Sequence, residues 1–307
     1  MNMTRQPLIL EIKGNSLDDG PGIRGVVFFK GCPLSCVWCH NPESKSPKVE
    51  ISYDPEVCIA CDTCIETCPE KAISKENPFF IDRSRCNLCF ECVENCPSGA
   101  LERVGLDMDV HQVLDVLMKY ESFYTSSGGG VTLSGGEPTM HMEYISELLK
   151  QLKARGIHTL LETCGHFDLE RFMAVVYPFV DTIYFDIKIY DEDEHRKYCG
   201  KGNKRILENF KELNRLSQKG AIELVPRTPL VPGITDTRSN MEAIAGFLKS
   251  LGIKKAQLLS YNPLWHKKNY KIGKESMFIH DPLMNRFMDT RKVEQCKDIF
   301  KQSSIFV

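Results

Sequence analysis

The alternation of apolar and polar stretches along the chain predicts a repeating strand–helix pattern. Six short β-rich stretches are each followed by a longer polar or amphipathic one. Strands are expected at residues 26–30, 131–133, 159–162, 182–188, 222–225 and 256–260. Such alternation calls for a parallel sheet with right-handed crossovers. Because a closed barrel of the TIM type needs eight units, we expect an α/β fold with an open, partial (β/α)6 TIM-like barrel.

Apolar residues at helical spacing place the helices between these strands. Val110, Val113, Leu114 and Leu117 share one face of a predicted helix, and Asp109 is suited to cap its start. Further helices are expected at about 140–155, 168–177, 203–219, 238–251 and 282–301. A short strand at 8–13 precedes the six units.

A cysteine-rich repeat interrupts this pattern between residues 46 and 103. The run Cys58-x2-Cys61-x2-Cys64-x3-Cys68-Pro69 recurs 28 residues later as Cys86-x2-Cys89-x2-Cys92-x3-Cys96-Pro97. Bacterial two-cluster ferredoxins use this run, and the fourth cysteine of each run ligates the other [4Fe–4S] cluster. We therefore assign Cys58, Cys61, Cys64 and Cys96 to one cluster, and Cys86, Cys89, Cys92 and Cys68 to the second. Two zinc sites are the alternative, although zinc sites usually show pairs of C-x2-C.

This repeat predicts two domains. We expect residues 46–103 to form a ferredoxin-like domain, inserted into a barrel made of residues 1–45 and 104–307.

Three further cysteines, Cys32, Cys36 and Cys39, follow the first of the six strands. Three thiolates can hold three corners of a cubane cluster and leave the fourth iron open to a substrate. Three buried cysteines or part of a zinc site are the alternatives, but no fourth cysteine lies nearby to complete the set. The loop lies at the carboxyl end of its strand, which is the functional end of such sheets.

Polar and glycine-rich residues follow the other strands. They are Ser134, Gly135, Gly136 and Glu137, then Glu162 and Thr163, then Asp186 and Lys188, then Arg227, and finally Asn262. Charged groups are poor core material unless they are paired or liganded, so the set favours a polar cavity facing the Cys32 loop. For any single member, a satisfied salt bridge is an equally good interpretation.

Composition and charge argue against several classes of function and location. The 307 residues carry a formal net charge of −2, which gives no reason to expect nucleic acid or an anionic membrane as a partner. The sequence shows no signal peptide and no membrane-spanning stretch, so we expect a cytoplasmic protein. In a reducing compartment, fourteen cysteines indicate metal ligation rather than disulfides.

Taken together, these motifs resemble a known family. They are C-x3-C-x2-C at Cys32–Cys39, Asp19-Gly-Pro-Gly-Ile-Arg24, Ser134-Gly-Gly-Glu-Pro138, Asp186-Ile-Lys188 and Arg227-x-Pro-Leu-Val-Pro-Gly233. The set resembles the radical S-adenosylmethionine enzymes that activate glycyl radical enzymes. The two-cluster insert is similar to that of their longer subgroup, which serves dehydratases, decarboxylases and lyases.

The resemblance implies three [4Fe–4S] clusters and S-adenosylmethionine as cofactors. S-adenosylmethionine would bind the open iron of the Cys32/Cys36/Cys39 cluster, and one electron would cleave it to a 5′-deoxyadenosyl radical. This radical would take hydrogen from a backbone glycine of a partner glycyl radical enzyme.

The resemblance also implies roles for individual residues. Trp38 and His40 would flank the adenine, and Asn262 stands where relatives place a histidine that contacts it. Ser134, Gly135, Gly136 and Glu137 would meet the amino group, Asp186 and Lys188 the ribose and carboxylate region, and Arg227 the carboxylate. Glu162, Thr163 and Asp186 would form a monovalent-cation site, and Asp19 and Arg24 would lie near the entering glycyl loop.

The same resemblance implies the partners of the protein, and two other functions are considered beside it. We expect a monomer that takes electrons from a reduced flavodoxin or ferredoxin, with the two insert clusters relaying them. One alternative is a radical S-adenosylmethionine enzyme that acts on a small molecule or a peptide. The other is a ferredoxin-like electron-transfer protein, against which the polar strand ends argue.

Overall fold

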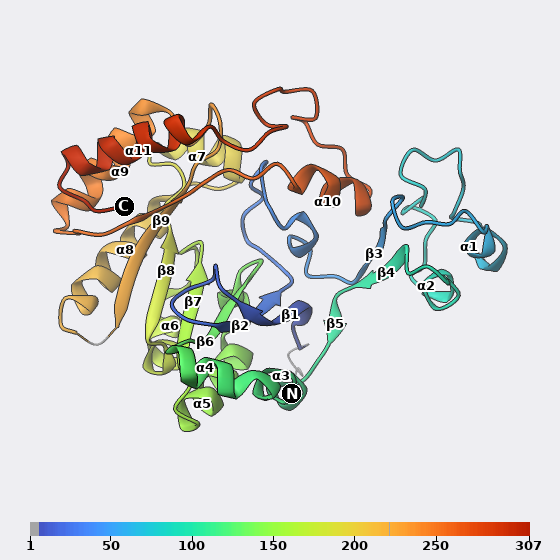
Figure 1. Ribbon diagram of the computed structural model, residues 1–307, viewed down its shortest axis with the longest axis horizontal. Helices are drawn as coiled ribbons and strands as arrows, with labels where there is room; N and C mark the ends of the chain where they lie inside the picture. Colours follow the sequence, from blue (N-terminus) through green and yellow to red (C-terminus); the bar gives the residue numbers. More distant parts are fainter. Residues whose placement is uncertain (1–5, 221) are drawn as a thin grey trace.

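The computed structural model describes residues 6–220 and 222–307. A curved eight-stranded sheet forms the larger lobe, and a small cysteine-rich lobe stands beside it (Figure 1). The strand order in the sheet is β10-β9-β8-β7-β6-β2-β1-β5. The strands are β1 (Leu8–Ser16), β2 (Arg24–Phe29), β5 (Leu106–Asp107), β6 (Gly130–Gly135), β7 (His158–Thr163), β8 (Thr182–Asp186), β9 (Glu223–Pro229) and β10 (Gln257–Leu259).

The predicted set of six parallel strands is confirmed. From β2 through β6, β7, β8 and β9 to β10, every neighbouring pair is parallel. The open, partial-barrel α/β fold is therefore the one that the sequence indicates. The short strand expected at 8–13 is β1, which extends to Ser16 and pairs in antiparallel orientation with β2. β5, which pairs with the other edge of β1, was not predicted.

Most of the helices on the outside of the sheet lie where the apolar spacing predicts them. They are α3 (Val110–Leu117), α4 (Glu121–Ser127), α5 (Met142–Ala154), α6 (Leu169–Val175), α8 (Lys204–Ser217), α9 (Arg238–Ser250) and α11 (Thr290–Gln302). Asp109 caps α3 in a capping box with Gln112, as predicted in part from the sequence. Helix α4 was not predicted.

Two other short helices were not predicted, and one start was wrong. Helices α7 (Glu192–Cys199) and α10 (Trp265–Lys271) lie where the sequence predicts no helix. The last helix begins at Thr290 rather than near residue 282. Asp289 caps it by accepting from the Arg291 amide at 2.8 Å, and the stretch that contains Pro282 forms turns instead.

The small lobe has its own sheet and its own apolar core. Strands β3 (Glu50–Tyr53) and β4 (Leu101–Val104) pair in antiparallel orientation, and α1 (Thr63–Thr67) and α2 (Glu91–Glu94) pack beside them. The sequence repeat is also a backbone repeat. Ala60 and Asp62 adopt left-handed φ values of 55° and 61°, and Leu88 and Phe90, 28 residues later, adopt 60° and 66°.

Helix α10 joins the two lobes. Lys271 Nζ lies 2.5 Å from Asp54 Oδ2, and Lys267 Nζ lies 2.6 Å from Glu56 Oε1. Tyr270 donates to the carbonyl of Pro78 at 3.0 Å. None of the helices within the described ranges is both long enough and apolar enough to cross a membrane.

Candidate active site

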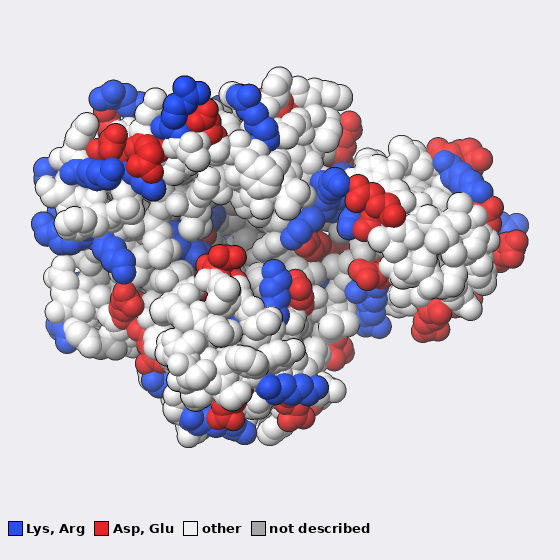
Figure 2. All heavy atoms as spheres, in the orientation of Figure 1, with Lys and Arg blue, Asp and Glu red and all other residues white. Residues whose placement is uncertain are grey.

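The three-cysteine loop and the strand ends enclose one cavity of about 370 Å³. Twenty residues line it, and most were predicted: Cys32, Cys36, Cys39, Trp38, His40, Asp19, Ser134, Gly135, Gly136, Glu162, Thr163, Asp186, Lys188 and Arg227. The space-filling view shows a hollow near the middle of the larger lobe (Figure 2). The structure therefore brings residues from five strand ends to the cysteine loop.

The cysteine loop is held by backbone bonds from two directions. The amides of Gly31 and Cys32 donate to the carbonyls of Ser44 and Lys45 at 2.7 and 3.2 Å. From the other side, the amide of Ser35 donates to the carbonyl of Cys199 at 2.9 Å. The end of α7 thus fixes the middle of the loop, between Cys32 and Cys36.

Four charged side chains form a closed network on one wall of the cavity. Arg227 Nη1 lies 2.5 Å from Glu162 Oε1, and Arg227 Nη2 lies 3.1 Å from Asp186 Oδ1. Lys188 Nζ lies 2.7 Å from Asp186 Oδ2. Ser134 donates to the other oxygen of Glu162 at 2.6 Å. Two cations and two carboxylates therefore balance each other in a largely buried site.

This balance keeps Asp186 and Arg227 ionised. Burial works against the carboxylate of Asp186, but the charges of Lys188 and Arg227 outweigh it and hold its pKa below the ordinary value. Burial also works against the Arg227 cation, yet Glu162 and Asp186 raise its pKa above the usual range. A charged ligand entering the cavity would meet fixed charges of both signs.

The carboxylates are not arranged as the predicted monovalent-cation site. Glu162 and Asp186 both pair with Arg227, and Thr163 donates its hydroxyl to Glu137 at 2.8 Å instead of facing them. Among residues 6–220 and 222–307, no group of three or more His, Cys, Asp or Glu side chains is arranged to hold a single metal ion.

The glycine turn after β6 packs against the cysteine loop, and its amides are used there. Gly136 donates to the carbonyl of Phe29 at 2.8 Å, and Glu137 donates to the carbonyl of Gly31 at 2.7 Å. A Cβ on Gly136 would overlap the carbonyl of Gly31. Gly135 and Gly136 also line the cavity, so the turn approaches the cysteine loop closely and borders the site as well.

Glu137 lies outside the cavity, contrary to its predicted ligand contact. Its side chain is fully buried. One carboxylate oxygen accepts from the hydroxyls of Thr139 and Thr163 at 2.6 and 2.8 Å, and the other accepts from the amide of Cys164 at 2.7 Å. Glu137 therefore ties the end of β6 to the end of β7, which positions the wall of the cavity.

His40 has a buried ring nitrogen that makes no hydrogen bond to any described residue. Its Nε2 is one of two buried side-chain nitrogen or oxygen atoms without a hydrogen-bond partner in the described part of the chain. Burial lowers the pKa of His40 to about 4, so the ring is neutral near pH 7. The Tyr261 ring lies edge-on to it, with 5.7 Å between centroids. A neutral ring with a free nitrogen suits contact with a heterocyclic ligand.

Two more predicted site residues lie elsewhere. Asn262 is not part of the lining, because its side-chain oxygen accepts from the amide of Leu264 at 2.9 Å. Arg24 is fully buried inside the barrel, where it donates to the hydroxyl of Thr132 at 2.7 Å and to the carbonyl of Val131 at 2.8 Å. The structure thus leaves Arg24 no surface with which to meet an entering loop, whereas Asp19 lies at the cavity.

Some lining residues were not predicted. Cys164, Leu34, Asn41, Pro229, Leu259 and Asp18 also face the cavity. The sequence did carry a signal for Cys164, because it directly follows Thr163 at the end of β7. Asp18 and Leu259 are the exposed members of the lining, so the cavity opens between the β1–β2 turn and the end of β10.

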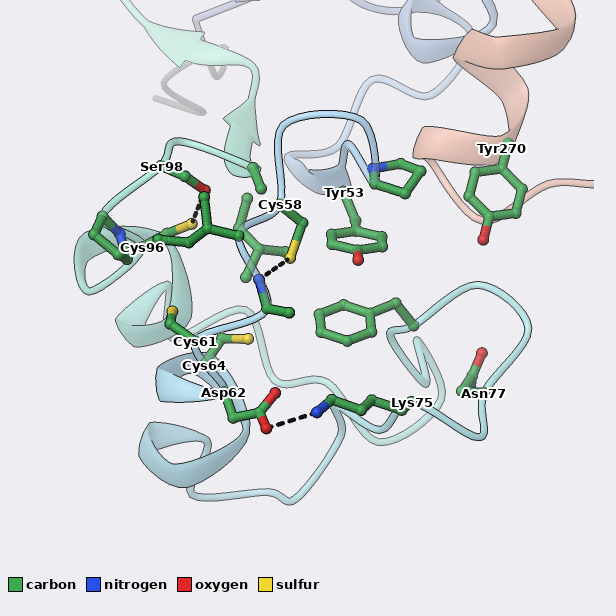
Figure 3. Close-up of a pocket in the computed structure, with 17 residues that line it drawn as sticks. Tyr53, Cys58, Cys61, Asp62, Cys64, Lys75, Asn77, Cys96, Ser98 and Tyr270 are labelled. Carbon is green, nitrogen blue, oxygen red and sulfur yellow. Dashed lines mark hydrogen bonds and ion pairs between the residues drawn. The ribbon is translucent and has the colours of Figure 1, made fainter.

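The small lobe sorts its eight cysteines into two cavities. Cys58, Cys61, Cys64 and Cys96 line one cavity of about 310 Å³ (Figure 3). Cys68, Cys86, Cys89 and Cys92 line the other. The sequence predicts this grouping, in which the fourth cysteine of each run joins the first three cysteines of the other run. Each cavity has a thiol set that suits a cubane cluster, although the second cavity is narrow, with a volume of about 10 Å³.

Comparison with known proteins agrees with both lobes. The radical SAM superfamily matches residues 84–248, and the 4Fe-4S dicluster domain matches residues 50–97. A trans-4-hydroxy-L-proline dehydratase activating enzyme from Clostridioides difficile is 41% identical over 97% of both chains. An isethionate sulfite-lyase activating enzyme from Nitratidesulfovibrio vulgaris is 38% identical over 88% of both chains.

Two further comparisons extend this picture. A choline trimethylamine-lyase activating enzyme from Oleidesulfovibrio alaskensis is 34% identical over 95% of both chains. A crystal structure of a radical SAM methyltransferase from Sphaerobacter thermophilus matches 98% of this chain and 75% of its own, with a TM-score of 0.51 and 12% identity. The structural likeness speaks for the fold alone.

Proposed function

Because the chain belongs to the radical SAM enzymes that activate glycyl radical enzymes, we propose that its partner is a glycyl radical enzyme of the dehydratase or lyase kind. The relatives that support this proposal activate a dehydratase and two lyases. The observation that carries it is the single cavity in which the three-cysteine loop meets the balanced charges at the strand ends.

The proposed cofactors are three [4Fe–4S] clusters and S-adenosylmethionine. The thiol sets fit three clusters, since two complete sets of four line the small-lobe cavities and a set of three lines the barrel cavity. When bound and reduced, the three-thiol cluster supplies the electron that cleaves S-adenosylmethionine to the radical that removes a glycine hydrogen from the partner. The remaining steps fall to the side chains of this chain.

Those side chains bind and orient the cofactor. Arg227 and Lys188 present positive charge toward a carboxylate, and Asp186 and Glu162 present negative charge toward an amino group and hydroxyls. Trp38 and His40 line the cavity beside the cysteine loop, where the unmatched His40 Nε2 suits an adenine. Fixed, prepaired charges need little rearrangement during the reaction.

Electrons are proposed to enter through the small lobe. The cavity of Cys58, Cys61, Cys64 and Cys96 is also lined by Tyr270 of α10, and its neighbour Lys268 donates to Asn41 of the cysteine loop at 2.8 Å. This continuity of contacts supports a relay from a reduced flavodoxin or ferredoxin. We propose a monomer that works in the cytoplasm, where a reducing environment keeps fourteen cysteines free for metal.

One experiment tests the proposal. The clusters are reconstituted without oxygen, and iron and sulfide are counted against the content of three clusters. The reduced enzyme is then given S-adenosylmethionine with each of three purified partners: trans-4-hydroxy-L-proline dehydratase, isethionate sulfite-lyase and choline trimethylamine-lyase. Production of 5′-deoxyadenosine together with a glycyl EPR doublet on one partner is the expected result.

Other outcomes are equally informative. Absence of 5′-deoxyadenosine with every partner would contradict S-adenosylmethionine cleavage, leaving the electron-transfer interpretation. Cleavage without a protein radical on any of the partners would favour a small molecule or a peptide as the substrate.

A further inference from the structure

Exposed apolar side chains gather in the turns between α10 and α11. Within residues 276–288, here called the rim segment, four large apolar side chains face solvent. They are Met277, Ile279, Leu283 and Phe287, with exposed fractions of 72%, 42%, 47% and 64%. A concentration of this kind marks an interaction site more often than scattered single residues do.

The rim segment has a fixed shape. The side-chain amide of Asn285 donates to the carbonyls of Ile279 and Asp281 at 2.7 and 2.9 Å. His266, buried in α10, donates from Nε2 to the carbonyl of Met284 at 2.8 Å and lies 2.7 Å from the hydroxyl of Ser276. The apolar side chains therefore stand on an ordered surface and need little ordering on contact.

The rim segment lies beside the mouth of the cavity. Tyr261 donates to the carbonyl of Met284 at 2.8 Å, and its own carbonyl accepts from the amide of Met288. The ring of Tyr261 also faces His40 inside the cavity. Two residues before Tyr261, the exposed Leu259 lines the cavity itself. The buried Tyr261 thus links the rim segment to His40 of the cavity lining.

The same surface carries little charge. Apart from His280, the only ionisable residues in the segment are Asp281 and Arg286. In the space-filling view, the part of the larger lobe formed by the turns between α10 and α11 is mostly white (Figure 2). A largely uncharged surface with exposed aliphatic side chains, one phenylalanine and one methionine resembles the centre of protein–protein interfaces.

We propose that the rim segment is the docking surface for the partner glycyl radical enzyme. This inference rests on the proposed function, since a folded protein must deliver a backbone glycine into the cavity and must therefore cover its mouth. Phe287 and Met277, the most exposed of the four, contact the partner next to its glycyl loop. A small molecule would gain nothing from an apolar surface outside the cavity.

The test separates docking from chemistry. Phe287→Ser and the double variant Met277→Ser/Phe287→Ser are compared with Phe123→Ser, which changes an exposed phenylalanine on α4. For each holoenzyme, S-adenosylmethionine cleavage by a chemical reductant is measured without a partner. The KM for the partner and the rate of glycyl radical formation are then measured with the three partners named above.

The expected result is a KM for the partner raised about tenfold or more in the rim variants, since a buried aromatic anchor dominates such interfaces. Partner-free cleavage should stay at the wild-type rate, and Phe123→Ser should match the wild type in both assays. An unchanged KM in the double variant would overturn the docking surface while leaving the proposed function intact.

Two further outcomes also overturn the inference. If the wild type activates none of the partners, the docking surface falls together with the proposed function. If sedimentation shows a wild-type dimer that Phe287→Ser converts to a monomer, the rim segment joins two copies of this chain instead.

Discussion

At the scale of single residues, Arg227 holds the charge balance of the cavity. Its guanidinium bridges Glu162 and Asp186, and only 8% of the residue is exposed. Arg227→Gln would leave two buried carboxylates with one cation, and breaking a buried pair in this way costs about 3–5 kcal/mol. We expect a lower unfolding temperature of the holoenzyme and loss of S-adenosylmethionine binding, measured by calorimetry.

The matched control is Arg238→Gln. Arg238 pairs with Glu242 on the surface of α9, and both side chains are largely solvated, so this pair contributes little. Equal binding and equal unfolding temperature in the two variants would show that the buried network does not hold the cofactor.

Glu137 gives a second prediction at this scale. Its carboxylate accepts from two hydroxyls and from the amide of Cys164. In Glu137→Gln, an NH2 group replaces one of the carboxylate oxygens and points at one of these donors, so that hydrogen bond is lost. A buried mismatch of this kind costs about 1–3 kcal/mol. We expect a lower unfolding temperature and weaker cofactor binding, whereas Glu147→Gln on the solvent face of α5 should leave both unchanged. Unchanged binding would mean that the β6–β7 link does not shape the cavity.

Residue positions were predictable where the period of a strand fixes them. Glu162, Asp186 and Arg227 lie at strand ends and face inward, as a period of two demands. Arg24 also faces inward, but it begins β2, whereas the cavity lies where the strands end. Glu137 and Asn262 lie in turns, where no period fixes the direction of a side chain.

At the scale of elements, α7 controls the cysteine loop through its last turn. Gly200 ends the helix with φ at 81°, and a Cβ there would overlap the hydroxyl of Ser35 between two of the cysteines. Gly200→Ala would therefore strain the backbone at a left-handed φ value and would displace Ser35 in the cysteine loop. We expect lower iron occupancy at the three-cysteine site, measured as a loss of S-adenosylmethionine-sensitive EPR signal.

Gly156→Ala is the control for this prediction. Gly156 also has a left-handed φ of 71°, but a Cβ there would meet nothing within 4 Å. It reproduces the backbone strain without the contact. If both variants keep the same iron content and the same EPR signal, the contact between α7 and the loop has no role in cluster binding.

The elements that were missed are those with weak patterns. Helix α7 buries only His195 and Cys199 among eight mostly charged residues, so it carries little apolar periodicity. Helix α10 has no side-chain cap and follows a proline turn. The parallel strands were predictable because most of them are short apolar runs with largely buried residues, as in β2 and β6. β10 is the exception, since none of its three residues is buried.

At the scale of the whole molecule, the small lobe should carry electrons to the barrel. Cys89→Ala removes one thiol from the cavity of Cys68, Cys86 and Cys92. We expect slower glycyl radical formation with a protein electron donor, because the relay loses a cluster, and unchanged S-adenosylmethionine binding. The rate is followed by EPR and the binding by calorimetry.

The control is Cys296→Ala, which changes a buried cysteine of α11 outside the three cavities proposed to hold clusters. The relay is refuted if the Cys89→Ala enzyme forms the glycyl radical as fast as the Cys296→Ala enzyme, with both a chemical reductant and a protein donor. The small lobe would then serve only to present a surface.

The antiparallel edge strand β1 has a consequence for synthesis on the ribosome. β2 pairs with β1 on one side and with β6 on the other, and the whole cysteine repeat is made before β6. The β1–β2 hairpin can close as soon as its turn emerges, since local contacts form early. The second edge of β2 stays open while the repeat is translated, and an unpaired edge invites pairing with other chains. The cavity walls on β6 to β10 are therefore translated after the small lobe, so a chain stalled before Gly130 would carry all the motif cysteines but no complete cavity.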